Sequence, residues 1–424
     1  MFSSSKFLKA VVLTQQLLND YVFMCNSRSK SSDFSREGNM LTFKRMILFQ
    51  LFMVKKSIQI ELDDFFNQFD YEDQSVTKQA YSLARKKVLP STFIHLMKAV
   101  LRDFYAGDAF KTFYGYRLCA IDGSVFGLNN TQALRDHFGV AKNQAVSYAR
   151  SYAACVYDVL NDMILTAQIG NYGSNERTVA KHLIEELKET VGFKNDLIIC
   201  DRGYPSKDLI AFLEAHHLTY VMRASQRSMK EIIQTTEPDQ HIQIIVKGKT
   251  IHARVLRFQL DSGDEEIIVT NLMDATFGIL EFKELYFKRW GIEEKYKVLK
   301  SKLEVENLTG GTPLSVEQDF FAAMYLVNMV ALVKQEANEM IQEADRNKLL
   351  KYEYQANTAM IIGKFKEHFI HLLCEMNQFI QEKIFRRILK GSIKNKTPIR
   401  PGRKYQRRDT KNASKFPLNR KRCL

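Results

Sequence analysis

The chain has 424 residues, 45% of them hydrophobic and 26% charged, which excludes a largely disordered protein and leaves room for about two to four domains. Its six cysteines are scattered without a CxxC pair, which argues against a disulfide framework or a cysteine zinc site and favours a reducing compartment. The net charge of +14 is uneven, because twelve Lys or Arg and a single acid lie between Lys394 and the C-terminus.

Residues 1–110 contain few glycines and several amphipathic runs, so we expect a helical region there. Within it, SVTKQAYSLARKKVLPS (75–91) predicts a helix that starts after a Ser75 cap and stops at Pro90. Its cations include three consecutive residues: Arg85, Lys86 and Lys87. Such a helix could lie against a DNA backbone. A surface helix of a small bundle explains the same pattern, and both alternatives stay open.

The middle of the chain alternates between strands and helices. YRLCAIDGS is an apolar run that ends in Asp122 and a glycine turn, and SYAACVYDVLNDMILTAQIG predicts a hairpin that turns at 160–162. A helix over 175–191 precedes a buried strand, DLIICDRGY, in which Asp201 follows the apolar residues. A second helix and a further strand come next. This order predicts a mixed α/β sheet with helices on its faces.

The remaining segments have other residue patterns. Residues of about 228–275 alternate polar and β-branched side chains, which predicts an antiparallel β insertion. A long helix is expected over 282–304, and helices continue through 311–390. The basic tail, 391–424, is expected to be disordered and to bind polyanions by counterion release, with a simple solubilising tail as the alternative. The apolar runs near the N-terminus are too short or too polar to span a membrane, so we expect a cytoplasmic protein.

One helical face carries an unusual set of side chains. In FKELYFKRWGIEEKYKVLK (282–300) they are Tyr286, Arg289, Glu293 and Lys300. At about 100° per residue, these four share an arc of roughly 60°, whereas the neighbouring acid Glu294 lies about 100° away. A solvated face with i,i+4 ion pairs would explain this stripe. The alternative is a metal-binding carboxylate flanked by groups that contact phosphates.

Three carboxylates are candidates for metal ligands: Asp122, Asp201 and Glu293. Carboxylates at strand ends reach the open edge of a sheet, where ligands bind in α/β folds, although strands also end in Asp for turn reasons. Three carboxylates could hold a pair of Mg²⁺ ions whose other ligands are water and phosphate. Two such ions could activate a water and stabilise the leaving oxygen of an in-line phosphoryl transfer.

The stripe has the Y-x2-R-x3-E-x6-K spacing of the YREK signature, and the chain resembles bacterial DDE transposases of the insertion-sequence-4 family. Asp122 in AIDGS and Asp201 in CDRGYPS resemble the family's first two acidic motifs, in the right order. The β insertion that precedes the helix with the third acid is also a family feature. The resemblance covers residues 116 to about 310.

The resemblance implies a ribonuclease-H-like catalytic core over about 111–310, flanked by the helical N- and C-terminal regions. Its metal-binding triad would be Asp122, Asp201 and Glu293, with two Mg²⁺ ions for which Mn²⁺ can substitute. It also implies contacts to DNA phosphates near the cleaved strand by three further residues: Tyr286, Arg289 and Lys300. Arginine suits a bidentate phosphate contact and lysine a point-charge contact.

The implied function is a DNA transposase that binds the terminal inverted repeats of its insertion sequence, and by analogy with the family the helical region over 1–110 is the DNA-binding region. It would cleave the ends by metal-dependent phosphodiester hydrolysis and join the 3′-OH ends to target DNA. The expected partners are double-stranded DNA and a second copy of the chain, with no membrane, in a bacterial cytoplasm where the DNA-bound protein is associated with the nucleoid. A catalytically inactive DNA-binding relic and a ribonuclease-H-like nuclease without strand transfer are the alternatives.

Overall fold

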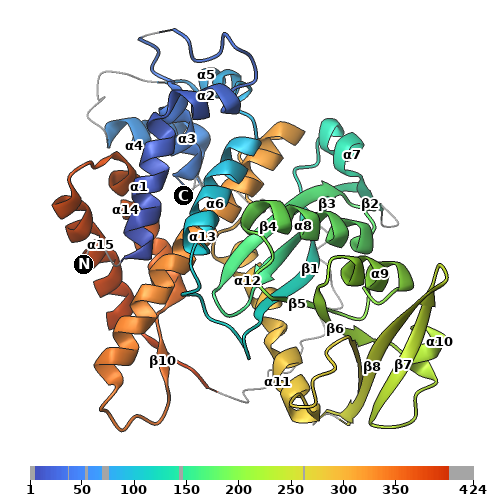
Figure 1. Cartoon of the computed structure of the whole chain (residues 1–424). Helices are drawn as coiled ribbons and strands as arrows, with labels where there is room; N and C mark the ends of the chain where they lie inside the picture. The colour runs from blue at the N-terminus through green and yellow to red at the C-terminus, as the bar shows by residue number, and fades with distance from the viewer. Residues whose placement is uncertain are drawn as a thin grey trace. The chain divides into compact units, whose positions relative to one another are not determined.

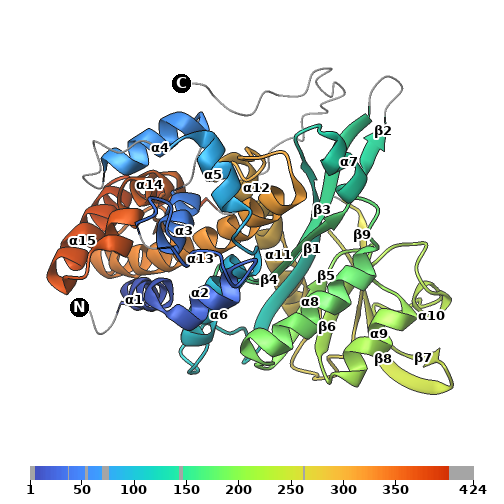
Figure 2. The same cartoon turned by 90° about the horizontal axis from the view of Figure 1, so that it is seen from above.

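The computed structural model describes the following residues: 5–36, 38–52, 56–68, 76–142, 147–260 and 263–400. Its contacts divide the chain into two compact units. We call residues 1–100 together with 299–424 the helical unit, and residues 101–298 the sheet unit. Figures 1 and 2 show the elements of both units. The N- and C-terminal helical regions, which the sequence suggested as separate domains, therefore fold into one unit.

The sheet unit is built on a mixed sheet. Its described strands are β1 (Arg117–Gly127), β2 (Val140–Lys142), β3 (Ser147–Asp158), β4 (Met163–Asn171), β5 (Asp196–Cys200), β6 (Thr219–Ala224), β7 (Asp239–Val246), β8 (Lys249–Gln259) and β9 (Glu265–Thr270). Their spatial order is β2-β3-β1-β5-β6-β9-β8-β7, with β4 paired to β3. β1, β3 and β4 form an antiparallel meander, and β5 and β6 continue the sheet parallel to β1. This order confirms the predicted ribonuclease-H-like core, and β7 to β9 confirm the antiparallel insertion.

The helices of this unit lie between the strands along the sequence and cover the sheet. They are α7 (Gln132–Phe138), α8 (Glu176–Val191), α9 (Lys207–Ala215), α10 (Lys230–Ile233), α11 (Ile279–Lys288) and α12 (Trp290–Ser301). α8 begins at an Asn175 cap, whose side chain accepts hydrogen bonds from two backbone N–H groups, and ends before Gly192 at φ +70°. It packs against β3 and β4 and lies beside α9 (Figure 2).

β1 and β5 pair in parallel, and a buried ion pair joins the first residues of the two strands. Arg117 lies opposite Asp196, and Ile121 lies opposite Cys200. The Arg117 guanidinium donates to both carboxylate oxygens of Asp196, at 2.5 and 2.9 Å, and neither side chain is exposed. Five residues further along each strand stand Asp122 and Asp201. The same register therefore brings Asp122, inside β1, next to Asp201, which directly follows β5.

The helical unit interleaves the two ends of the chain. Its elements are α1 (Lys6–Asn19), α2 (Tyr21–Ser27), α3 (Phe43–Leu51), α4 (Ile58–Asn67), α5 (Lys78–Arg85), α6 (Ser91–Phe104, whose last turn belongs to the sheet unit), α13 (Pro313–Asp345), β10 (Tyr354–Gln355), α14 (Thr358–Cys374), α15 (Gln378–Lys394) and β11 (Thr397–Pro398). Phe7 of α1 packs its ring against Phe365 and Phe369 of α14 and Phe385 of α15. Gln15 donates to backbone carbonyls at the end of α14.

Two expectations about the C-terminal part can be compared with the structure. α15 continues to Lys394 and Thr397 of β11 pairs with β10, so ordered structure extends beyond residue 391, where the tail was expected to begin. The rest of the tail, 401–424, lies outside the described residues.

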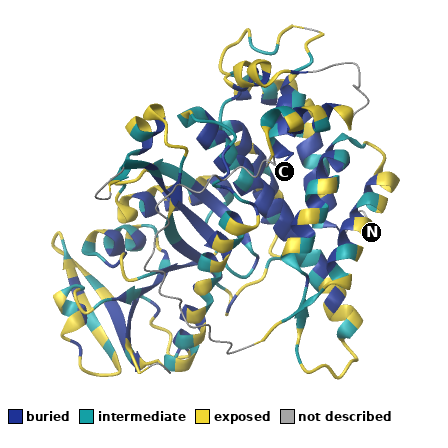
Figure 3. Cartoon of the chain, turned by 180° about the vertical axis from the view of Figure 1, so that it is seen from behind, coloured by how far each residue is buried: buried dark blue, intermediate teal, exposed yellow. Residues whose placement is uncertain are grey.

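Among the helices described, α13 alone is long and apolar enough to cross a membrane, judged by length and composition. In its most apolar 18-residue segment, 78% is buried inside the protein (Figure 3). Such burial is typical of a core helix.

We expect Arg117→Met to lower the free energy of unfolding by about 3–5 kcal/mol, because it leaves the buried Asp196 carboxylate without its charged partner. Urea denaturation of the variant and the wild type measures the difference. Lys297→Met is the matched control, since Lys297 pairs with Glu294 at the surface of the same unit, and it should cost less than about 1 kcal/mol. Equal losses in the two variants would show that the buried pair does not stabilise the strand pairing.

Candidate active site

The three predicted metal ligands all belong to the sheet unit. The strand end and glycine turn expected at Asp122 are wrong, because β1 continues through Asp122 and Gly123 to Gly127 and stays paired with β3. Asp201 directly follows β5, and Glu293 lies in the first turn of α12. Burial raises the pKa of Asp122 to about 6, although the Gly123 N–H and the charge of Arg289 oppose the shift. The negative charges of Asp201 and Glu293 raise it further. The charges of the other two carboxylates thus act on Asp122.

The glycine after Asp122 is required by a tyrosine from the neighbouring strand. A Cβ atom on Gly123 would lie 1.9 Å from the hydroxyl oxygen of Tyr152 on β3, far inside van der Waals contact. Tyr204, from the motif that follows Asp201, is buried next to Tyr152, and burial raises the pKa of both phenols. Tyr152 and Tyr204 are thus buried neighbours.

The stripe that carries Glu293 is not on one uninterrupted helix. The long helix expected over 282–304 is instead divided into α11 and α12, with Arg289 between them. Here the N–H of Arg289 bonds to Tyr286 O at 3.0 Å and the N–H of Ile292 bonds to Arg289 O at 3.1 Å. These bonds span three residues, as in the tighter 3₁₀ turn. Gly291 contributes, because glycine has a low helix propensity.

Two residues of the stripe contact the acids directly. The Tyr286 hydroxyl donates to Asp201 Oδ1 at 3.2 Å, and Arg289 Nη2 donates to Glu293 Oε1 at 3.0 Å. The Arg289 guanidinium also lies 5.4 Å from the ring centres of both Tyr286 and Trp290. The i,i+4 ion pair of the alternative interpretation is thus present, but the Arg289 side chain is only 4% exposed, so this is not a solvated face.

The donor chemistry of the triad fits a hard cation such as Mg²⁺, which prefers carboxylate oxygens. In the described part of the chain, however, no group of three or more His, Cys, Asp or Glu side chains is arranged to hold a metal ion. In this structure Tyr286 and Arg289 instead hydrogen-bond to one oxygen each of Asp201 and Glu293.

The predicted DNA-binding cations of the helical unit have different surroundings. α5 begins at Lys78 with Thr77 as its cap, whereas Ser75, the expected cap, lies outside the described residues. Lys86 is exposed just beyond the helix, and Lys87 is half-buried over the ring of Phe34. Lys300, the last stripe residue, lies in the final turn of α12 and is partly exposed.

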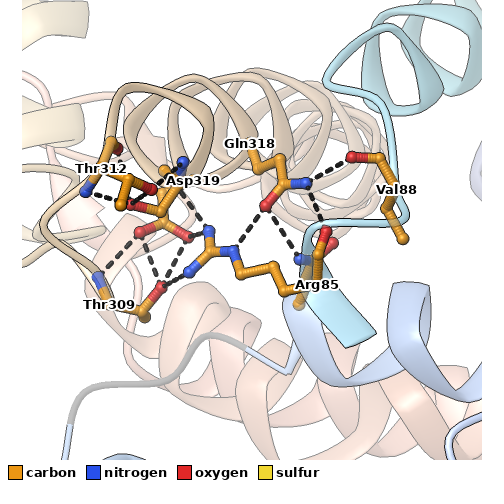
Figure 4. Close-up of polar contacts among 8 residues, drawn as sticks. Arg85, Val88, Thr309, Thr312, Gln318 and Asp319 are labelled. Carbon is orange, nitrogen blue, oxygen red and sulfur yellow. Dashed lines mark hydrogen bonds and ion pairs between the residues drawn. The ribbon is translucent and has the colours of Figure 1, made fainter. Parts of the chain in front are cut away.

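Arg85 is buried, which contradicts its predicted contact with a phosphate. Figure 4 shows its guanidinium bonded to Gln318, Thr309 and Asp319, and it also donates to Ser315 O. All of these partners belong to the helical unit. Gln318 in turn donates to the carbonyls of Arg85 and Val88. The bundle interpretation of 75–91 therefore holds for Arg85, which joins the end of α5 to the start of α13.

Sequence reasoning missed several buried polar residues near the triad. Arg223 of β6 pairs with Glu266 of β9 at 2.6 Å, and burial raises the pKa of Glu266, as does the charge of Asp201. Lys295 and Tyr296 of α12 are buried beside Glu293. The available signal was a charged residue inside an otherwise apolar run, as in TYVMRA, but such a pattern does not identify the partner.

The comparisons with known proteins agree with the geometry. A model described as the transposase DDE domain matches residues 113–329, just over half of the chain, and spans all three acids. The chain belongs to the transposase DDE domain family. This confirms the resemblance to the DDE transposases of the insertion-sequence-4 family.

Individual relatives of this transposase-family chain are distant. It is 26% identical over 238 residues to the transposase InsG for insertion sequence element IS4 of Escherichia coli (strain K12), covering 51% of this chain and 52% of that protein. The chain thus spans about half the length of that curated relative. A cryo-EM structure of a piggyBac transposase synaptic complex with hairpin DNA matches with 11% identity and a TM-score of 0.44 over 91% of this chain and 84% of the other.

We expect Gly123→Ala to lower the free energy of unfolding by about 1–3 kcal/mol, because its methyl group must displace the Tyr152 ring. Gly107→Ala is the control, since a Cβ atom there meets nothing within 4 Å. Adding Tyr152→Leu to the Gly123→Ala variant should recover part of the loss by removing the clashing ring. Urea denaturation of the four proteins, wild type included, tests this. A Gly123→Ala protein as stable as the control would contradict the packing argument.

Proposed function

We propose that the protein is a DNA transposase that cuts the ends of its own insertion sequence and joins their 3′-OH groups to target DNA. The supporting observation is the convergence of Asp122, Asp201 and Glu293 in one electrostatic environment, directly contacted by Tyr286 and Arg289. Membership of the transposase DDE domain family supports the same reaction class.

In this proposal Asp122, Asp201 and Glu293 hold two Mg²⁺ ions, for which Mn²⁺ can substitute. When bound, the ions supply an acidified water and stabilise charge on the attacking and leaving oxygens. The protein contributes the positions of the carboxylates: Asp122 from within β1, Asp201 from the residue after β5 and Glu293 from a helix. Rigid elements of this kind keep reacting groups in place.

Arg289 and Tyr286 change partners as substrate binds. Arg289 turns from Glu293 to a DNA phosphate, which its planar guanidinium can contact through two N–H groups. Tyr286 donates its hydroxyl to a phosphate oxygen instead of Asp201. Burial raises the pKa of Tyr286, so the phenol stays protonated and acts as a donor rather than as a nucleophile. Both cleavage and joining therefore proceed without a covalent protein–DNA intermediate.

The remaining DNA contacts are assigned to three lysines, of which Lys86 is exposed and Lys87 and Lys300 are partly buried. Lys300 contacts a phosphate as a point charge, and Lys86 and Lys87 contact the backbone from the helical unit, whereas Arg85 is excluded because it is buried. The partners in this proposal are the inverted repeats, target DNA and a second copy of the chain that pairs the two ends. The protein acts in the bacterial cytoplasm and is associated with the nucleoid when bound to DNA.

We expect purified protein to cut DNA that carries the ends of its own element in Mg²⁺ and not in EDTA. Glu293→Gln should lower the rate by at least about 100-fold, because it removes a charged ligand from the reacting centre. Glu294→Gln is the matched control: the neighbouring Glu294 is exposed, pairs with Lys297, and should cut like the wild type. Gel analysis of end-labelled DNA measures both rates.

The products of this assay separate the alternatives. Ends that are bound but never cut, under conditions in which a related active transposase cuts, would point to a DNA-binding relic. Cut ends that never appear joined to a target plasmid would point to a nuclease without strand transfer. Joined products that require both Mg²⁺ and Glu293 would support the proposal in full.

A second variant tests the exchange at Arg289. Arg289→Met removes the cation that is bonded to Glu293, so we expect the variant to bind Mn²⁺ roughly tenfold more tightly. A tenfold change corresponds to about one pKa unit of interaction between the two charges. The same variant should cut DNA more slowly. Lys288→Met removes an adjacent i,i+4 pair to Glu284 and serves as the control. Mn²⁺ titration and the cleavage assay give the two readouts. Weaker Mn²⁺ binding by Arg289→Met would contradict the exchange.

A further inference from the structure

Glu293 reaches the triad differently from the two aspartates. Asp122 and Asp201 follow from the register of two paired strands, so backbone hydrogen bonds fix their separation. Glu293 lies on α12, and no strand pairing determines how far that helix slides or turns relative to β1. Side-chain contacts from α12 to the sheet must therefore determine the position of Glu293.

Tyr296 makes the most direct of these contacts. Its hydroxyl donates to the backbone carbonyl of Asp122 at 2.9 Å and accepts from the Cys155 thiol at 3.4 Å. The residue is 8% exposed, and its ring packs edge-on against Phe126, also on β1. One turn of helix thus separates Glu293 from a side chain that is bonded to the peptide of the first acid.

Lys295 fixes the same helix at a second point. Its ammonium donates to Asp162 Oδ1 at 2.7 Å and to Asp162 O at 2.9 Å, in the turn between β3 and β4. Tyr157 donates to the same carboxylate oxygen at 2.6 Å, and the Lys295 side chain is only 5% exposed. Asp162 itself has φ +58°, so the turn presents this carboxylate in a defined orientation.

Gly291 allows the close approach that both contacts need. A Cβ atom at this position would lie 3.0 Å from Val159 Cγ1 and 3.5 Å from Tyr157 Cε1. The start of α12 therefore packs directly on the end of β3 and the residue that follows it. Contacts at residues 291, 295 and 296 surround Glu293 along the helix without touching its carboxylate.

We propose that Lys295 and Tyr296 are positioning residues that set Glu293 relative to Asp122, so that the triad closes around its metal ions. The inference rests on the proposed function. Neither side chain contacts substrate or metal; each acts through the placement of α12. Removing the Tyr296 hydroxyl frees the helix from the Asp122 carbonyl, and removing the Lys295 charge frees it from the β3–β4 turn.

The test uses Tyr296→Phe and Lys295→Met in the full-length protein, with Lys297→Met on the exposed side of α12 as the matched control. Mn²⁺ binding is followed by quenching of Trp290, the only tryptophan, which is 39% exposed and three residues before Glu293. Cleavage of end DNA gives kcat and KM. Thermal unfolding shows whether each variant is folded.

We expect Tyr296→Phe and Lys295→Met to raise the Kd for Mn²⁺ about 10–100-fold and to lower kcat by a similar factor. KM for DNA should stay unchanged, because the phosphate-contacting residues are intact, and Lys297→Met should match the wild type. A variant that merely loosened the fold would lower the unfolding midpoint and bind DNA more weakly as well. If Lys295→Met does not fold, Tyr296→Phe, which keeps its ring, decides the question.

Two negative results have different meanings. If the wild type binds Mn²⁺ and cuts DNA while Tyr296→Phe does both equally well, the positioning role is overturned and the proposed function stands. If the wild type shows neither quenching by Mn²⁺ nor cleavage of its ends, the proposed function is overturned, and the positioning role with it.

Discussion

The parallel pairing of β1 with β5 is the constraint on which the candidate site depends. Arg117 and Asp196 face each other at the start of these strands in a fully buried, bidentate ion pair. A slip of one residue would separate that pair and leave two charges without partners, at a cost of several kcal/mol. It would also turn every side chain of the strand to the opposite face. The same register places Asp122 and Asp201 side by side, so an interaction at one end of the strands determines the spacing of the acids at the other.

Glu293 and the neighbouring Arg289 add a balance of charges that the topology of the sheet does not explain. Two acids already lie together, and burial with their mutual repulsion raises the pKa of Asp122. Adding Glu293 without a cation would increase that repulsion. Arg289 and Tyr286 offset it by bonding to Glu293 and Asp201. Arg289 thus offsets part of the negative charge of the cluster, and Tyr286 adds a hydrogen bond from a neutral hydroxyl.

Sequence reasoning predicted the apolar strands and the mixed sheet, because apolar runs and turn residues are local patterns with a clear physical period. It placed Asp201 at the end of its strand correctly, but it ended the first strand at Asp122, whereas pairing with β3 carries β1 on to Gly127. It failed where partners lie far apart in the chain. Arg85 looked like an exposed cation, yet its partners are more than 220 residues away, and their presence cannot be read from a basic run. The same limit hid the joining of the N- and C-terminal helices in one unit and the contacts of Lys295 and Tyr296.

The buried arginines differ in how many hydrogen bonds hold them, which bears on the proposed exchange at Arg289. Arg117 bonds to both oxygens of Asp196 and to a backbone carbonyl, and Arg85 bonds to Gln318, Thr309, Ser315 and Asp319. Arg289 makes one side-chain hydrogen bond among the described residues, to Glu293. Arg117 and Arg289 each also have one buried nitrogen without a partner there, so this feature alone does not distinguish them. The number of bonds does: the proposed exchange would cost Arg289 a single side-chain hydrogen bond, and a phosphate can accept two from a guanidinium group. A change of partner at Arg117 or Arg85 would break three or four hydrogen bonds, each of which contributes to stability.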